Sequence, residues 1–305
     1  MAEMKPGRIV EWRRLSSTLA IFHLIPDDGA RFPPFEAGQY IALRRDDCRL
    51  TKKVKEGAEV RFVPDLDADG KQKRGPVTHS YSIAAAPFEA ARGNYLEFYV
   101  VLEKESDGTL GRFTEALFRI DTAGADRLDY MDRIVGDFTL AKRAAGFEHV
   151  LMIGTGTGLA PFVSMIKQLH HDSQQDVPHA RYTLMHANRT PEELAYHREL
   201  LDIEASKAFD FVYVASVSRP SARDREDARV GAGRANNVLR HIFGLPAREA
   251  QAVAPALPTD RPLAMLQKRI DPSRTVVLSC GNPSGMEDIE WIAAHAGLSF
   301  EKEVW

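Results

Sequence analysis

The sequence predicts a two-domain protein, with an N-terminal antiparallel β-barrel and a C-terminal α/β domain built on a parallel sheet. Short β-forming stretches separated by Gly, Pro and Asp clusters fill the first half, which is typical of an antiparallel barrel or sandwich. Continuous apolar strands alternate with amphipathic helices in the second half, which indicates a parallel sheet covered on both faces. The pattern changes near residues 142–147, so we expect domains over residues 1–147 and 148–305.

Six short apolar stretches predict the strands of the first domain, at residues 9–12, 18–25, 39–43, 58–63, 79–84 and 95–102. The segment 111–120 interrupts them and carries apolar residues at helical spacing, so we expect a short helix there. Residues 44–76 are polar and turn-rich, with 10 Lys/Arg against 7 Asp/Glu, and form an elaboration of the barrel.

The second domain is predicted to contain strands at residues 149–154, 180–187, 209–218 and 275–281, and helices at 160–172, 190–205 and 284–297. Thr190 with Glu193, and Ser284 with Glu287, have capping-box spacing at the start of the last two helices. Gly297 is placed to end the final helix. Residues 246–274 contain five prolines and are predicted to be a long connection.

Composition excludes several classes of protein. The 305 residues are 44% hydrophobic and 27% charged, which is ordinary for a soluble globular chain. No apolar run approaches the roughly 18 residues of a membrane span, and residues 1–14 lack the apolar core of a secretory signal, so we expect a cytoplasmic protein. Cys48 and Cys280 are the only cysteines, which argues against a disulfide framework or an iron–sulfur cluster. The net charge of −3 gives no reason to expect nucleic acid, and no metal site is predicted.

A glycine-rich turn, GTGTGLAPF over residues 154–162, follows a predicted buried strand and opens a helix. Glycines let the backbone approach a phosphate, and the helix start offers free N–H groups. The alternative is a turn that merely joins strand to helix, since the strict GxGxxG spacing is absent.

Cationic side chains follow the next two strands. A fold that binds NAD commonly places an Asp or Glu after the second strand, but this chain has Asn188 and Arg189 there. Ser218 and Arg219 follow a later strand, and Arg234 comes after a Gly-Ala-Gly turn. Guanidinium groups suit a 2′-phosphate, which favours NADP over NAD; the alternative is that these are surface arginines without a ligand.

Two features near the end of the chain have both a structural and a functional interpretation. Cys280 begins a Cys-Gly-Asn-Pro turn after an apolar strand, and a lone cysteine there is ordinarily a small buried side chain. Trp305 ends the chain, and its ring must pack on the protein or stack on a planar ligand.

Taken in order, these motifs resemble the ferredoxin–NADP+ reductase family over nearly the whole chain. The family's Arg-x-Tyr-Ser pattern corresponds to residues 79–82, and its Gly-x-x-Ser/Thr-x-x-Leu helix to Gly111, Thr114 and Leu117. Gly136 and Phe138 match a Gly-x-Phe segment. The glycine-rich turn, the Ser-Arg and Gly-Arg pairs, Cys-Gly-Asn-Pro and a terminal aromatic residue follow.

The resemblance implies a six-stranded FAD-binding barrel, a five-stranded NADP domain, and FAD lying between them. Tyr81 and Trp305 would stack on the two faces of the isoalloxazine, and the helix at Gly111 would receive the pyrophosphate. The family arginine at the pyrophosphate is His79 here, which leaves Arg112 as the nearest cation. The implied FAD residues are His79, Ser80, Tyr81, Ser82, Tyr99, Val100, Val101, Gly111, Arg112, Phe113, Thr114, Thr157 and Trp305.

The resemblance also implies a nicotinamide site. Ser82, Cys280 and Glu303 would be the catalytic residues, with Ser82 near the flavin N5, Cys280 beside the nicotinamide C4, and Glu303 supplying a carboxylate. The implied NADP residues are Thr155, Gly156, Thr157, Gly158, Asn188, Arg189, Ser218, Arg219, Arg234, Cys280, Gly281, Asn282 and Pro283.

The implied activity is electron transfer between NADPH and a ferredoxin or flavodoxin, because a flavin exchanges electrons singly or in pairs. The chain lacks the ferredoxin C-x4-C-x2-C pattern, so the carrier is expected to be a separate, acidic protein that meets the basic segment 44–76. We expect the enzyme itself to be a monomer. Two alternatives stay open: a diaphorase that reduces free flavin, quinone or another small acceptor, and a dinucleotide-binding module without turnover.

Overall fold

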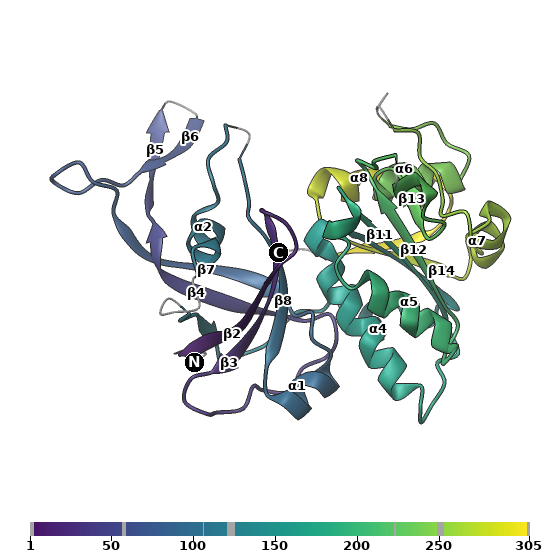
Figure 1. Cartoon of the computed structure of the whole chain (residues 1–305), viewed down its shortest axis with the longest axis horizontal. Coiled ribbons are helices and arrows are strands. Elements are labelled where there is room, and N and C mark those ends of the chain that lie inside the picture. Colours follow the sequence, from purple (N-terminus) through teal and green to yellow (C-terminus); the bar gives the residue numbers. More distant parts are fainter. Residues whose placement is uncertain are drawn as a thin grey trace. The chain divides into compact units, whose positions relative to one another are not determined.

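The computed structural model describes residues 3–56, 59–105, 107–120, 126–222, 224–248 and 253–303 (Figure 1). The chain separates into two compact units. Unit 1 comprises residues 1–34, 40–82 and 90–135, and unit 2 comprises residues 35–39, 83–89 and 136–305. Two short segments of the N-terminal half, residues 35–39 and 83–89, therefore belong to unit 2. The boundary expected at residue 147 stays a prediction.

Unit 1 contains two antiparallel sheets, of strand order β1-β9-β4-β7 and β2-β3-β8. Alternating buried positions on β2 and β4 turn one face of each strand inward. Phe22 stacks on Phe98 at 5.1 Å and lies 5.7 Å from Trp12, so aromatic rings form the centre of the β2-β3-β8 sheet. The strands are β1 (Met4–Lys5), β2 (Gly7–Arg14), β3 (Leu19–Pro26), β4 (Tyr40–Arg49), β7 (Arg74–Ser82), β8 (Leu96–Val101) and β9 (Asp129–Met131).

A separate hairpin is formed by β5 (Thr51–Glu56) and β6 (Glu59–Pro64), which pair with each other alone among the described residues. The β6 strand was predicted, whereas β5 was not, because its run of lysines hides the alternation. Unit 1 also contains α2 (Arg112–Phe118), which packs against β4 and β7 where the sequence predicts a helix.

Unit 2 has a six-stranded parallel sheet of order β13-β12-β11-β10-β14-β15, one strand more than the resemblance implies. The strands β11, β12 and β13 follow one another on one side of β10, and β14 lies on the other side of β10. The order therefore reverses between β10 and β14, which is the position where open parallel sheets bind ligands. The strands are β10 (His149–Thr155), β11 (Arg181–Asn188), β12 (Phe211–Val217), β13 (Val230–Ala232), β14 (Thr275–Cys280) and β15 (Ser299–Lys302).

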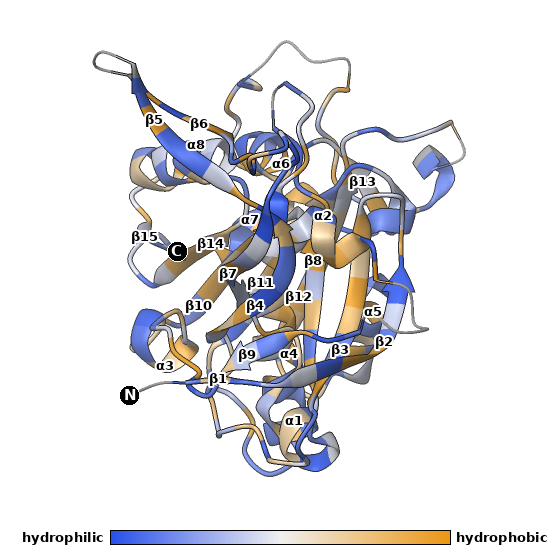
Figure 2. Ribbon diagram, turned by 90° about the vertical axis from the view of Figure 1, so that its left-hand side faces the viewer, coloured by the Kyte–Doolittle hydropathy of each residue, from blue (hydrophilic) through white to orange (hydrophobic). Residues whose placement is uncertain are grey.

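Helices cover both faces of this sheet (Figure 1). One face forms a single apolar core with α6, α7 and α8, through residues such as Ile153, Val214 and Ile289. The helices α4 and α5 lie on the other face (Figure 1). Figure 2 shows that the central strands of this sheet are mainly hydrophobic, whereas hydrophilic residues are frequent in the helices and loops. The helices of unit 2 are α3 (Leu140–Arg143), α4 (Ala160–Asp172), α5 (His197–Ser206), α6 (Ala235–Ile242), α7 (Leu263–Arg269) and α8 (Pro283–His295), and α1 (Pro87–Gly93) has residues in both units.

Two predicted helix starts were wrong. The helix expected at Thr190 begins at His197, after a 3-10 turn, η2 (Pro191–Glu193), and a left-handed Tyr196 with φ 60°. Glu193 does not cap this helix, because its carboxylate pairs with Arg189. The last helix is capped by Asn282 rather than Ser284, and its side chain accepts a hydrogen bond from the Gly285 N–H at 3.2 Å.

The predicted connection 246–274 contains α7, which the prolines obscured. In the part of the chain that the structure describes, no helix is both long enough and apolar enough to cross a membrane.

Two buried histidines make the stability of unit 2 depend on pH. His149 bridges Thr275 and Thr183 through its ring nitrogens, at 3.3 and 2.9 Å, and His186 lies 3.2 Å from the Tyr213 hydroxyl. Burial lowers the pKa of each imidazole from 6.5 to about 3. Below pH 6.5 the unfolded chain therefore binds protons that the folded chain does not, so stability falls as the pH falls.

We predict that each histidine lowers the free energy of unfolding by about 2 kcal/mol between pH 7 and pH 5. Carboxylates also contribute over this range, so the informative quantity is the difference between the wild type and His149→Gln, which keeps hydrogen-bonding groups without an imidazole. Urea unfolding at both pH values should show a smaller loss in the variant by about that amount. Equal losses would show that His149 is not the group responsible.

Candidate functional site

The turns after β10 and β14 interlock at the point where the strand order reverses. Thr155 Oγ1 accepts a hydrogen bond from the Asn282 N–H at 3.0 Å. Gly281 has φ +132°, and a Cβ on it would overlap Thr155. A Cβ on Gly158 would likewise overlap the backbone carbonyl of Cys280. The absence of side chains at both glycines therefore lets the two turns touch.

The interlocked turns include most of the predicted nicotinamide residues. Thr155 ends β10, and Gly156, Thr157 and Gly158 lie in the 3-10 turn η1 (Gly156–Leu159) that precedes α4. Cys280 ends β14, and the residues that follow it lead into α8, namely Gly281, Asn282 and Pro283.

Cys280 and Glu303 meet at the end of the sheet. The Cys280 thiol is buried and lies 3.3 Å from Glu303 Oε2, with which it forms a hydrogen bond. Glu303 follows β15, which runs parallel to β14, and the Glu303 N–H donates to the Ser279 carbonyl at 3.1 Å. Burial, with the Glu303 carboxylate next in importance, raises the pKa of the Cys280 thiol well above 9.0. The thiol therefore stays protonated at neutral pH.

The predicted adenylate residues lie together at the ends of β11 and β12. The Ser218 N–H donates to the Asn188 carbonyl, and the Arg219 N–H donates to the Arg189 carbonyl, both at 2.9 Å. The Gly233 N–H donates to the Val217 carbonyl at 2.9 Å, which brings the turn before α6 to the same edge. Arg219 and Arg234 are both exposed there, and Arg234 is the N-cap residue of α6.

Arg189 has a more restricted environment than its sequence position suggests. Its guanidinium forms a two-point ion pair with Glu193, with distances of 2.8 Å from Nε and 2.5 Å from Nη2. Glu193 is 5% exposed, and its backbone carbonyl accepts a hydrogen bond from the Asn188 side chain. Sequence reasoning missed Glu193 as a partner, although its i,i+4 spacing from Arg189 was a visible signal.

In unit 1, aromatic rings join the predicted segment of β7 to the start of α2. The Phe113 ring lies 5.5 Å from the His79 ring and 5.4 Å from the Tyr81 ring. Phe113 is fully buried. The Tyr81 hydroxyl is buried and has no hydrogen-bond partner among the described residues, and burial raises its pKa.

The segment after β8 also reaches the start of α2. The Gly111 N–H donates to the Glu103 carbonyl at 3.0 Å, and the Glu103 N–H donates to Thr114 Oγ1 at 3.2 Å. A Cβ on Gly111 would crowd both Glu103 and Thr114, so glycine is required where this strand passes the helix. Three predicted segments thus converge around α2. The other predicted residues on these elements are Ser80 and Ser82 on β7, Tyr99, Val100 and Val101 on β8, and Arg112 in the first turn of α2.

These features fit a flavin nucleotide. The buried Tyr81 hydroxyl has no hydrogen-bond partner among the described residues, and Arg112 forms no ion pair with a described side chain. Both polar groups are therefore available to a ligand at the start of α2. Trp305, predicted to stack on the other flavin face, lies outside the described residues. Among the residues that are described, no group of three His, Cys, Asp or Glu side chains could hold a metal ion.

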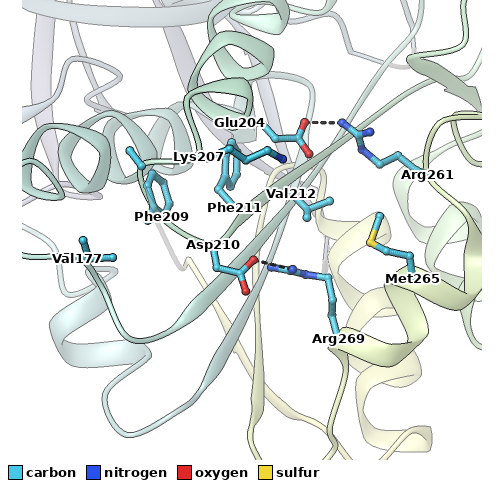
Figure 3. A pocket seen from close by; sticks show the side chains of 11 residues that line it. Val177, Glu204, Lys207, Phe209, Asp210, Phe211, Val212, Arg261, Met265 and Arg269 are labelled. Atoms are coloured by element: carbon cyan, nitrogen blue, oxygen red, sulfur yellow. Dashed lines mark hydrogen bonds and ion pairs between the residues drawn. The ribbon is translucent and has the colours of Figure 1, made fainter.

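A pocket of about 650 Å³ opens at the opposite edge of the unit 2 sheet, where β12 begins (Figure 3). Its arginines pair with carboxylates inside it, Arg261 with Glu204, and Arg269 with Asp210 at 2.7 Å. None of the predicted site residues lines this pocket.

Comparison with known proteins identifies related sequences and similar folds. Residues 152–290 match the family model of the oxidoreductase NAD-binding domain. The ferredoxin–NADP reductase of Azotobacter vinelandii is 27% identical over 198 residues, covering 65% of this chain and 60% of the relative. The flavohemoprotein of Bacillus subtilis is 26% identical over 231 residues, covering 73% of this chain and 45% of the relative.

The chain thus spans about half the length of these curated relatives. A crystal structure of a ferredoxin NADP+ reductase from Neisseria gonorrhoeae with bound FAD and NADP superimposes with a TM-score of 0.65 at 18% identity, over 99% of both chains. In sequence and in fold, the chain is similar to ferredoxin–NADP reductases. The fold predicted from the sequence is confirmed for both halves of the chain.

We predict that the Thr155 hydroxyl holds the turn after β14 in place. Thr155→Val keeps the shape but removes the acceptor, whereas Thr155→Ser keeps it. Because Asn282 is exposed and water can replace the bond, we expect a loss of about 0.5–1 kcal/mol in stability for the valine variant alone. Hydrogen exchange should show faster exchange of the Asn282 amide in Thr155→Val. An equally protected amide in both variants would contradict the role.

Proposed function

We propose that the protein is an FAD-dependent oxidoreductase that takes electrons from NADPH and passes them to a one-electron carrier protein such as a ferredoxin or flavodoxin. The observation that carries the proposal is the contact between Cys280 and Glu303 beside the interlocked turns at the switch point of the sheet. The oxidoreductase NAD-binding domain and the similar fold of a reductase with bound FAD and NADP support both cofactors, and the relatives named ferredoxin–NADP reductase support the carrier.

The nicotinamide end of NADPH is assigned to the turns after β10 and β14. Thr155, Gly156, Thr157 and Gly158 offer a glycine-rich approach to the phosphates. The remaining members of this subsite are Cys280, Gly281, Asn282 and Pro283. The protonated Cys280 thiol supplies a small, polarizable and uncharged wall, and its hydrogen bond to Glu303 limits its rotation. Such a wall orients the nicotinamide without competing as a nucleophile.

The adenylate end is assigned to Asn188, Ser218, Arg219 and Arg234. Arg189 acts mainly by holding Glu193, which positions the turn after β11. Two exposed guanidinium groups at one edge suit a dianionic 2′-phosphate and support NADPH over NADH.

FAD is assigned to unit 1, and when bound it supplies the exchange between paired and single electrons. Tyr81 offers its ring for stacking on the isoalloxazine. Ser82, the next residue on β7, is a proposed catalytic residue together with Cys280 and Glu303. The residues proposed to hold the pyrophosphate region are His79, Ser80, Gly111, Arg112, Phe113 and Thr114. The strand beside this region contributes Tyr99, Val100 and Val101. The proposed set also includes Thr157 and Trp305. Because His79 replaces an arginine, Arg112 carries the main charge neutralisation. The corresponding domains are residues 1–147 and 148–305.

A haem protein is a second candidate acceptor, because the flavohemoprotein of Bacillus subtilis matches 73% of this chain. A diaphorase that uses only small acceptors is distinguished from both by its failure to reduce carrier proteins.

We predict that the purified protein contains one FAD per chain, which is measured by releasing the flavin and separating FAD from FMN. In stopped-flow experiments, NADPH should bleach the flavin, and ferredoxin or flavodoxin should reoxidise it faster than free FMN or a quinone does. A protein with no flavin would refute the proposal. Reoxidation by small acceptors alone would assign a diaphorase, and preferential reoxidation by a haem protein would favour the second acceptor.

We predict that Arg219→Ala with Arg234→Ala weakens NADPH selectively. Charged hydrogen bonds contribute about 1–3 kcal/mol each, so the KM for NADPH should rise by about 30-fold or more. The KM for NADH should change by less than about 3-fold, since NADH has no 2′-phosphate. Arg198→Ala, at an exposed arginine on α5, is the control and should leave both constants unchanged. Equal effects on the two cofactors would move the 2′-phosphate site elsewhere.

A further inference from the structure

The β5–β6 hairpin stands apart from the sheets of unit 1. Its strands pair with each other and with no other strand among the described residues, and it extends from the end of β4 (Figures 1 and 2). It contributes none of the buried core side chains of unit 1. A two-stranded hairpin in water is marginally stable and adds little to a fold, so the exposed side chains of this hairpin are its distinctive feature.

The strand register separates two sets of positions on the hairpin. Residues directly opposite each other point to the same face, and Lys53 pairs with Phe62 while Lys55 pairs with Val60. We call this set the hairpin face; its positions are Thr51, Lys53, Lys55, Val60, Phe62 and Pro64. The register places cations and apolar residues on this face and no acidic residue.

The hairpin face is unusually apolar for an exposed surface. Phe62 is 69% exposed and Val60 is 46% exposed. Together with Leu66, they are three of the six large hydrophobic side chains exposed in the described parts of the chain, and all three lie within seven residues. Lys53 and Lys55 are exposed beside them and form no ion pair with a side chain that the structure describes. Aromatic residues are enriched at the centre of protein interfaces, and the two lysines give this one a positively charged surround.

The hairpin follows the end of β4 that is remote from Tyr81, a residue of the proposed flavin site. The β7 strand begins at Arg74, near the hairpin, and reaches Tyr81 seven residues later, which corresponds to about 23 Å at a rise of roughly 3.3 Å per residue. The hairpin face therefore contacts a part of the carrier away from its redox group, which must approach the flavin for electron transfer. Its contacts affect the rate and strength of association rather than the chemical step.

We propose that the hairpin face is a docking surface for an acidic electron-carrier protein, an inference that rests on the proposed function. Lys53 and Lys55 attract acidic side chains of the carrier, and Phe62 enters an apolar patch that they surround. A folded partner with local acidic residues fits better than a nucleic acid or an anionic membrane. The net charge of −3 opposes attraction to a uniformly anionic polymer or surface, whereas two lysines suffice to orient a local patch.

The test uses the full-length holoprotein in two hairpin variants, Lys53→Glu/Lys55→Glu and Phe62→Ser. A charge-matched control, Arg198→Glu/Lys268→Glu, changes the net charge by the same amount at exposed residues of unit 2. Steady-state reduction of an acidic [2Fe–2S] ferredoxin and of a flavodoxin is measured with NADPH, at low salt and at about 0.5 M salt, where the Debye length falls to a few ångströms. Reduction of ferricyanide measures the chemistry without docking.

The expected result is a KM for the carrier that rises at least 5-fold in the lysine variant at low salt, with the difference disappearing at high salt. Phe62→Ser should raise the KM at both salt concentrations, because its contact is apolar. The kcat values, ferricyanide reduction and the control variant should be unchanged. An unchanged KM in both hairpin variants, or an equal change in the control, would overturn the proposal.

Failure of the proposed function has a different signature. A wild-type protein that reduces ferricyanide but neither carrier lacks the proposed activity. In that case, calorimetric titration measures binding of each carrier and tests the docking surface independently of electron transfer. Carrier binding that is lost in the hairpin variants supports the surface, and no binding to the wild type overturns it. Binding of phosphatidylserine vesicles or heparin by the wild type, lost in the lysine variant, would assign the face to a membrane or a polyanion instead.

Discussion

The close approach of two backbone turns at the switch point of the unit 2 sheet is the constraint on which the candidate site depends. Gly158 lies against the Cys280 carbonyl and Gly281 lies against Thr155, so a side chain at either glycine would push the turns apart. The Thr155–Asn282 hydrogen bond then joins the turns, and Asn282 also caps α8. One small region thus determines the end of β10, the end of β14 and the direction of a helix.

The same region sets the environment of the buried thiol. Because β14 and β15 run in parallel, Cys280 and Glu303 reach the same edge of the sheet from distant parts of the chain. Their burial disfavours a thiolate, which suits a wall for a reacting ring better than a nucleophile. The charged groups of this edge differ in their surroundings: Arg189 forms an ion pair with Glu193, while Arg219 is exposed.

Unit 1 separates its structural and its interacting residues more sharply. The rings of Phe22 and Phe98 stabilise the β2-β3-β8 sheet, and Phe113 fixes the start of α2 beside Tyr81. The β5–β6 hairpin contributes nothing to this core, and its Phe62 faces solvent. A large exposed aromatic side chain has a cost in water, and a protein surface that covers it removes that cost.

The sequence by itself determined the two fold classes, most of the strands, and the order of the motifs, because alternating and continuous apolar patterns and glycine-rich turns are local signals. It also identified Cys280, Arg219 and Arg234 as candidates. Only the tertiary structure decided which residues meet. Arg189, predicted to contact a ligand, pairs in the structure with Glu193, predicted to cap a helix. The cap of α8 is Asn282 rather than the predicted Ser284. The tertiary structure also placed Lys53 and Phe62 on one face of a hairpin. Such choices depend on contacts between residues separated in the chain, whose competition with local preferences is settled by packing.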